Sequence, residues 1–164
     1  SAECFTEDGF FRTGDRGELR ADGMLKITGR TKELFKTAKG KYVAPAPIEN
    51  RLNAHPMVEM SMVSGVGQSA AYAMVVPAEA LRPRLDDAAV RAEIEREMQA
   101  LLARVNGEVA EYEQLQVIVV VREPWSIENG TLTPTMKIKR GPIEQAVAPR
   151  VETWYATGRR VIWA

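Results

Sequence analysis

Residues 57–77, MVEMSMVSGVGQSAAYAMVVP, form two apolar runs separated by a turn that contains glycine. Short apolar runs bounded by turn residues are typical of strands, and a short connection favours an antiparallel pair. Gly65, Gly67 and Ala70 also match the dinucleotide-binding pattern G-x-G-x-x-A. That pattern requires a helix to follow, whose N-terminus meets a pyrophosphate, and here a second strand follows. We therefore predict a β-hairpin with a plain glycine turn.

Helical patterns lie on both sides of this predicted hairpin. Residues 47–55, PIENRLNAH, predict a short helix with Pro47 in its first turn and an end before Pro56. Between Asp86 and Asn106 the apolar residues recur at the spacing of one helix face. Asp86 is the expected N-cap of this longer helix.

The remaining residues complete a mixed pattern. Residues 115–121, LQVIVVV, predict a buried strand, and residues 142–155 predict a final helix that Pro149 kinks. From residue 45 onward we therefore predict a small α+β domain, in which helices flank a short sheet.

The first part of the chain is typical of β structure. Residues 16–30, RGELRADGMLKITGR, place apolar residues on both sides of Asp22-Gly23, a pair that favours a tight hairpin turn. Residues 31–44 predict a second, cationic hairpin or loop. Residues 1–30 are too short to bury a hairpin of their own, so we expect them to be the end of another unit.

Composition limits the classes of function. The chain has 164 residues, 45% of them hydrophobic, which suffices for the buried core of one domain. Its 22 basic and 22 acidic residues balance, which argues against a dedicated nucleic-acid binder. One cysteine and one histidine argue against an internal disulfide and against a zinc or di-metal site.

The sequence also bears on location. No apolar run approaches the roughly 18 residues of a membrane span, and no signal-peptide pattern opens the chain. Together with the low cysteine content, this leads us to expect a cytoplasmic protein.

Two local patterns could carry chemistry. Residues 131–140, TLTPTMKIKR, end in three cations within four positions, which on its own is typical of a solvated surface. Asp15 is the last residue of TGD at 13–15, and Arg30 is the last residue of GR at 29–30. A carboxylate and a guanidinium can together bind the two hydroxyls of a ribose. On local chemistry alone, a surface salt bridge between them is the simpler interpretation.

Two long segments, in this order, resemble the C-terminal part of the adenylate-forming enzymes. They are FRTGDRGELRADGMLKITGRTKELFKTAKGKYVAPAPIEN at 11–50 and ENGTLTPTMKIKR at 128–140. This superfamily includes acyl-CoA synthetases, the adenylation domains of peptide synthetases and luciferases. YEQ at 112–114, EPWSIENG at 123–130 and LTPTMKIKR at 132–140 are most similar to long-chain fatty-acyl-CoA synthetases and their bacterial relatives.

The resemblance implies two parts. Residues 1–31 would be the end of a large N-terminal adenylation domain, and residues 32–164 a mobile C-terminal lid domain. Asp15 matches the aspartate that holds the AMP ribose hydroxyls, and Arg30 matches its partner arginine. Lys32 matches the hinge about which the lid turns between two half-reactions.

The resemblance also assigns roles within the lid. The segment from Lys36 to Lys41, including Gly40, is similar to the loop that lines the pantetheine tunnel during thioester formation. Lys137 matches the catalytic lysine of adenylation, and Arg140 matches a nucleotide-side arginine three residues later. The family often has glycine before the catalytic lysine, where this chain has Met136. Glu49 is carried over as a structural helix residue.

The function implied by the resemblance is ATP-dependent acyl-CoA ligation, with a fatty acid as the expected carboxylic acid. ATP or AMP, CoA and Mg²⁺ would be the cofactors, bound mainly by the protein's own N-terminal adenylation domain. The lid alone is expected to be inactive, and the full-length protein could be peripheral to the inner membrane. Two alternatives remain: an adenylation domain that passes its acyl group to a carrier protein or reductase, and a non-catalytic lid-like interaction module.

Overall fold

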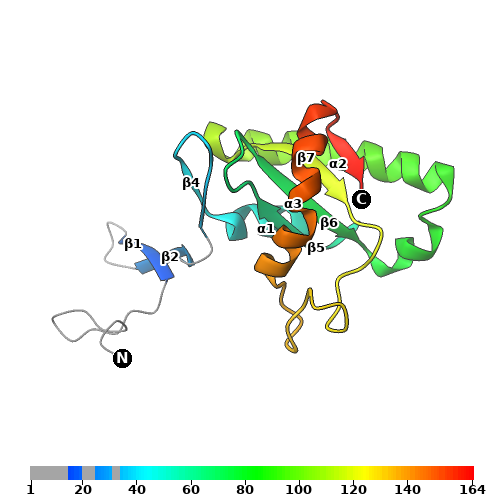
Figure 1. Ribbon diagram of the computed structural model, residues 1–164, viewed down its shortest axis with the longest axis horizontal. Coiled ribbons are helices and arrows are strands. Elements are labelled where there is room, and N and C mark those ends of the chain that lie inside the picture. The colour runs from blue at the N-terminus through cyan, green and yellow to red at the C-terminus, as the bar shows by residue number, and fades with distance from the viewer. Residues whose placement is uncertain (1–14, 20–24, 31–33) are drawn as a thin grey trace.

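The computed structural model describes residues 15–19, 25–30 and 34–164. Strands β1 (Asp15–Leu19) and β2 (Leu25–Arg30) form an antiparallel hairpin, as predicted. Strands β3 (Phe35–Lys36) and β4 (Tyr42–Val43) form the second small hairpin expected within residues 31–44. Both hairpins precede the main sheet in the chain (Figure 1).

The main sheet has four strands in the order β5-β6-β7-β8. Their bounds are β5 (Val58–Ser64), β6 (Ala71–Pro77), β7 (Leu115–Val120) and β8 (Val161–Trp163). β5 and β6 are antiparallel, which confirms the predicted hairpin, whereas β6–β7 and β7–β8 are parallel. Parallel neighbours need long crossovers, and helices α2 and α3 supply them.

The helices cover both faces of this sheet. Helices α1 (Pro45–Asn53) and α2 (Ala88–Glu108) pack on one face, where Ala73 and Val75 of β6 point. Helix α3 (Arg140–Ala156) packs on the other face, against Tyr72 and Met74. Short 3-10 helices occupy Glu79–Arg84 (η3) and Glu111–Glu113 (η4). The predicted α+β class, a short sheet flanked by helices, is therefore confirmed.

Three helix boundaries differ from the predicted ones. α1 begins at Pro45, two residues before the predicted start, and Pro47 lies in its first turn, as predicted. The N-cap of α2 is Asp87 rather than Asp86, and its Oδ1 accepts hydrogen bonds from the Ala89 and Val90 amides. α3 begins at Arg140 and continues through Pro149.

The glycine turn between β5 and β6 is a packing feature. A Cβ at Gly65 would lie 2.9 Å from the Ala71 Cα, so a larger residue would collide with backbone. Gly67 adopts a φ of 69°, and its amide donates to the Lys36 carbonyl oxygen at 3.1 Å. The turn thus holds the β3–β4 hairpin, and a strand follows it, so the dinucleotide alternative does not apply.

Among the helices that the structure describes, none is both long and apolar enough to cross a membrane.

Candidate functional site

The segment that contains Lys137 folds into a tight hairpin. Leu132 and Ile138 form an antiparallel bridge, and the Thr133 amide donates to the Lys137 carbonyl oxygen at 2.7 Å. The Met136 amide donates to the Thr133 carbonyl oxygen at 2.8 Å, which closes a turn. This arrangement matches a three-residue hairpin loop, a turn followed by a left-handed residue. Lys137 is therefore the first residue after the loop, and its side chain is exposed.

Met136 is that left-handed residue, with a φ of 64°. Glycine adopts this conformation most easily, since a Cβ brings steric strain there. The geometry accounts for the glycine that the family resemblance leads us to expect before the lysine. Methionine satisfies the same turn here and keeps its side chain exposed.

Thr133 fixes the backbone of Lys137 and was not among the residues predicted from the sequence. Its Oγ1 accepts a hydrogen bond from the Lys137 amide at 3.1 Å and lies 3.0 Å from the Thr135 Oγ1. A threonine four residues before the lysine, across a proline turn, is the signal that could have identified it.

The base of this hairpin is anchored in the core. Leu132 is fully buried in the cluster beneath α3, and Trp125 is almost fully buried beside it. The Asn129 Oδ1 accepts hydrogen bonds from the Ser126 and Thr131 amides at 3.1 and 3.2 Å. Lys137 is consequently carried on an ordered support rather than on a loose loop.

Arg140 is turned toward the body of the domain. Its Nη1 donates to the Val63 carbonyl oxygen at 2.9 Å, and its Nη2 lies 2.7 Å from the Glu49 Oε1. Glu49 lies on α1 and is buried, in agreement with the structural role expected for it. The structure therefore joins Arg140 to α1 and β5.

The β3–β4 hairpin holds Lys36 and Gly40. Gly40 has a φ of 79°, and its amide donates to the Thr37 carbonyl oxygen at 3.0 Å. The Lys36 Nζ lies 5.7 Å from the centre of the Tyr42 ring, a cation–π distance. Gly40 thus closes the turn, and Lys36, Lys39 and Lys41 lie on the same hairpin.

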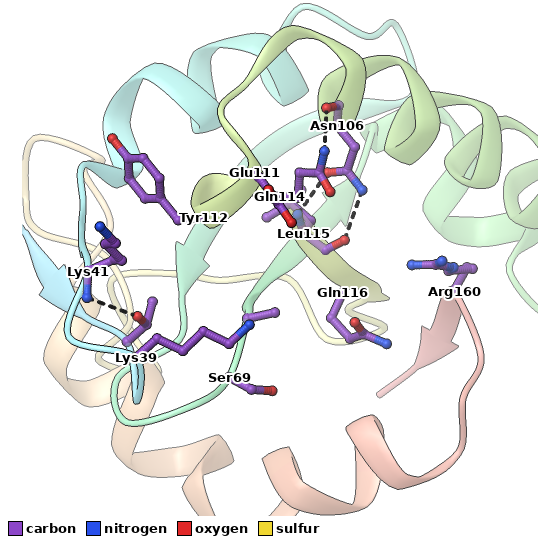
Figure 2. Close-up of a pocket in the computed structure, with 12 residues that line it drawn as sticks. Lys39, Lys41, Ser69, Asn106, Glu111, Tyr112, Gln114, Leu115, Gln116 and Arg160 are labelled. Atoms are coloured by element: carbon purple, nitrogen blue, oxygen red, sulfur yellow. Dashed lines mark hydrogen bonds between the residues drawn. The ribbon is translucent and has the colours of Figure 1, made fainter.

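A cavity of about 590 Å³ lies beside this hairpin. Lys39 extends into it from the hairpin, and Arg160, just before β8, lies on the opposite side (Figure 2). Lys41 lies 6.0 Å from the centre of the half-exposed Tyr112 ring, which lines the same cavity. Within residues 34–164, these three cations form no ion pair, and they outnumber Glu111, the acidic residue among those that line the cavity, so the cavity carries a net positive charge.

The wall of the cavity between α2 and β7 is rigid. The Asn106 Nδ2 donates to the Leu115 carbonyl oxygen at 3.0 Å, and the Leu115 amide donates to the Asn106 Oδ1 at 2.7 Å. The sequence analysis did not single out Tyr112 or Arg160 as site residues. They join the cavity through tertiary packing, and only the cationic run at Lys39 and Lys41 gave a local signal.

The first hairpin brings Asp15 and Arg30 into register. They are Cα partners across β1 and β2, so the two predicted ribose-binding residues occupy the same position along the hairpin. Lys32, the predicted hinge, lies outside the described residues.

The predicted lid residues fall into two groups. Figure 1 shows the β3–β4 hairpin and the loop between β7 and α3, which carries Lys137, at separate sides of the domain. The structure does not unite Lys36, Gly40 and Lys137 in one pocket. The hairpin that carries Lys137 lies on one side of the domain, and the β3–β4 hairpin with the neighbouring cavity lies on another.

The fold is that of the C-terminal domains found in adenylate-forming enzymes. The chain belongs to the AMP-binding enzyme C-terminal domain family, whose profile matches residues 32–159.

Among curated proteins, long-chain-fatty-acid–CoA ligases are similar to this chain. A long-chain-fatty-acid–CoA ligase of Mycobacterium tuberculosis is 34% identical over 94% of this chain and 28% of its own length. Long-chain-fatty-acid–CoA ligase 1 of Cavia porcellus is 31% identical over 96% of this chain and 24% of its own length. The chain thus spans about a quarter of the length of these relatives.

Solved structures agree with this assignment. The adenylation domain of a carboxylate reductase from Mycobacterium chelonae has a TM-score of 0.77 and 30% identity, covering 94% of this chain and 24% of that one. The corresponding domain from Segniliparus rugosus, solved with AMP and a co-purified carboxylic acid, has a TM-score of 0.74 and 30% identity. That match covers 95% of this chain and 25% of the Segniliparus chain.

Proposed function

We propose that this chain supplies the lid of an ATP-dependent acyl-CoA ligase that acts on fatty acids. Residues 1–31 are the end of the large adenylation domain, residues 32–164 are the lid, and Lys32 is the hinge. The family membership and the long-chain-fatty-acid–CoA ligases among its relatives support this proposal. The single cysteine fits a reducing compartment, so the cytoplasm is part of the proposal.

The observation that carries the proposal is the exposed Lys137 on an ordered hairpin. In the first half-reaction a carboxylate oxygen attacks the α-phosphorus of ATP, and the bond to pyrophosphate breaks. Two anions must approach each other, and charge builds on the phosphate oxygens. A positioned ammonium between them stabilises that charge where it develops. Lysine suits this role because it is a compact charge on a long stem.

The nucleotide is held mainly by the large domain, which also binds Mg²⁺. From this chain, Asp15 and Arg30 contribute the groups that bind the ribose hydroxyls. Their register across β1 and β2 supports the pairing, because both emerge at the same level of the hairpin. ATP supplies the phosphoanhydride that activates the carboxylate.

The second half-reaction uses the other side of the lid. The thiol of CoA attacks the acyl carbonyl carbon, the bond to AMP breaks, and AMP leaves. Lys36 and Gly40 lie on the hairpin that we assign to the pantetheine tunnel. The neighbouring cavity, with Lys39, Lys41 and Arg160, provides charge-assisted donors for the phosphates of CoA.

The experiment that tests the proposal separates the two half-reactions in the full-length protein. Lys137→Ala should slow acyl-adenylate formation by about 100-fold or more, the usual effect of losing one group that stabilises transition-state charge. Transfer from supplied acyl-AMP to CoA should be largely retained, because the lysine acts on the phosphate. Pyrophosphate exchange and thioester formation measure the two steps.

Lys139→Ala is the matched control, since it removes an exposed cation from the same segment. The proposal requires a much smaller effect there. Equal, modest losses in both variants would instead indicate a solvated surface charge at residue 137.

A second candidate function is an adenylation domain that passes its acyl group to a carrier protein or reductase domain. The likeness to carboxylate reductase adenylation domains favours it. A CoA-dependence assay distinguishes the two candidates. If CoA is the acceptor, Lys39→Ala and Arg160→Ala should each raise the KM for CoA about tenfold, the effect of losing one charge-assisted hydrogen bond. Product formation that requires a carrier and ignores CoA would favour the second candidate.

A further inference from the structure

At Val63, the side chains of Glu49 and Arg140 bind the backbone of β5, an edge strand of the main sheet. β5 lies at one end of the strand order, so one of its edges has no partner among the strands that the structure describes. The Val63 amide donates to the Glu49 Oε1 at 3.3 Å, and the Val63 carbonyl oxygen accepts from the Arg140 Nη1 at 2.9 Å. The pair thus binds both backbone groups of one edge residue, as a neighbouring strand would.

The pair itself is tight and shielded. The Arg140 Nη2 lies 2.7 Å from one Glu49 carboxylate oxygen and 3.3 Å from the other. The side chains are only 10% exposed for Glu49 and 19% exposed for Arg140. Solvent screens this pair less than it screens a surface ion pair, so removing either side chain should disturb the junction more than the loss of a surface pair would.

The pair lies at the base of the Lys137 hairpin. Arg140 is the first residue of α3 and follows Ile138 and Lys139, which form the second side of that hairpin. Residues 134–137 at the tip are exposed, so the direction of the tip is set where the hairpin joins the body. Glu49 connects that junction to α1, which directly follows the β3–β4 hairpin.

We propose that Glu49 and Arg140 are positioning residues for adenylation: by fixing the start of α3 on α1 and β5, they set where the Lys137 ammonium is presented. This inference rests on the proposed role of Lys137 and adds a role for Arg140 other than nucleotide contact. The β3–β4 hairpin keeps its own attachment to the β5–β6 turn through the Gly67–Lys36 hydrogen bond. Loss of the pair should therefore disturb the first half-reaction and spare the second.

The test uses Glu49→Gln, Arg140→Gln and the double variant in the full-length protein. Each single change should lower the kcat of acyl-adenylate formation by about 100-fold, as a misplaced catalytic group does. The KM for ATP should stay within about twofold, since the Arg140 guanidinium is engaged by Glu49 and by the Val63 carbonyl oxygen. The double variant should be no slower than the slower single variant, because the two residues act as one unit. Thioester formation from supplied acyl-AMP should remain near the wild-type rate.

Two further variants serve as controls, one for the loss of any ion pair on α1 and one for poor folding of the glutamine variants. Arg51→Gln removes a different ion pair of helix α1, the one with Glu108. Both side chains of that pair are more than 40% exposed. The rates of acyl-adenylate formation and of thioester formation should therefore be unchanged. Arg140→Lys keeps the charge and loses the planar fork, and an intermediate loss of adenylation is expected even if the glutamine variants fold poorly.

Several outcomes would overturn the inference. An increased KM for ATP in Arg140→Gln, with Glu49→Gln unchanged, would identify a direct nucleotide contact. Parallel losses in both half-reactions would identify a general stabilising role. A wild-type protein that forms no acyl-adenylate would overturn the proposed function and this inference together, whereas active wild type with silent variants would overturn the inference alone.

Discussion

At the scale of single residues, the backbone of Met136 decides how Lys137 is presented. With a φ of 64°, it reverses the chain so that the Lys137 amide can bond the Thr133 Oγ1 at 3.1 Å. A non-glycine residue in this region carries strain of about 1–2 kcal/mol. Such strain persists only where the surrounding structure holds it, and here the bridge between Leu132 and Ile138 does so.

Met136→Gly should raise the free energy of unfolding by about 0.5–1 kcal/mol. Relief of the left-handed strain gives roughly 1–2 kcal/mol, and the greater freedom of glycine in the unfolded chain returns roughly 0.5–1 kcal/mol. Denaturant titration measures the change. Met136→Ala is the control, because alanine keeps a Cβ and should bring no gain. A loss of stability in the glycine variant would show that the methionine side chain contributes contacts that outweigh the strain.

For the segment at 137–140, the sequence indicated which charged residues to consider, but it did not indicate their partners. The cationic run at 137–140 and its similarity to adenylate-forming enzymes led us to predict Lys137 as a site residue. The contact between Arg140 and Glu49 joins residues from distant parts of the chain, and no periodicity or motif records such a contact. For Arg140 the sequence therefore indicated a functional residue, whereas its hydrogen bonds with Val63 and Glu49 depend on the tertiary fold.

At the scale of elements, helix α2 depends on its first-turn cap. The Asp87 Oδ1 accepts from the Ala89 amide at 2.9 Å and from the Val90 amide at 3.4 Å. These are two of the amides that a helix N-terminus leaves without an intrahelical acceptor. Val90 and Ile94, which follow, are buried against the sheet, so the cap sets where this face begins.

Asp87→Ala should lower the free energy of unfolding by about 1 kcal/mol, the usual effect of removing a capping side chain. Asp86→Ala is a matched control, because it changes the adjacent aspartate and should stay within about 0.5 kcal/mol of wild type. Thermal or denaturant unfolding of both variants makes the comparison. A larger loss of stability in Asp86→Ala than in Asp87→Ala would identify Asp86 as the cap, as the sequence analysis predicted.

Elements with a strong local pattern were predictable, and those defined by pairing were not. The apolar run at 115–121 and the helical spacing after Asp86 were sufficient to identify β7 and α2. Strand β8 has three residues, Val161–Trp163, and exists through parallel pairing with β7. So short a segment carries no period of its own. The adjacent aspartates likewise differ only in which one the folded backbone places at the cap.

At the scale of the whole molecule, contacts of Tyr72 and Tyr155 hold α3 against the sheet. The Tyr155 hydroxyl donates to the Ala70 carbonyl oxygen at 2.6 Å. Tyr72 of β6 packs edge-on against Trp154 and Tyr155, at centroid distances of 5.7 and 6.5 Å. Burial raises the pKa of Tyr155, and the neighbouring Tyr72 adds to the increase. Burial also raises the pKa of Tyr72, although its hydrogen bond with Ser64 opposes this.

These raised pKa values predict a loss of stability in alkali. Below a pH of about 10, the ordinary tyrosine pKa, both phenols are protonated in the folded and unfolded states and have no effect on the pH dependence. Above it, the unfolded chain releases protons that the folded chain retains, so the free energy of unfolding falls as pH rises. Tyr155→Phe removes one such group. Its unfolding free energy should fall less steeply above pH 10, by at most about 1.4 kcal/mol per pH unit.

At neutral pH the same variant should be about 1 kcal/mol less stable, because the hydrogen bond to Ala70 is lost. The two stability curves should therefore converge as the pH rises, and groups that do not interact with Tyr155 cancel in the difference between them. Denaturant titrations at a series of pH values measure both curves. Parallel curves would mean that Tyr155 ionises equally in the folded and unfolded chains, and its raised pKa on burial would then be wrong.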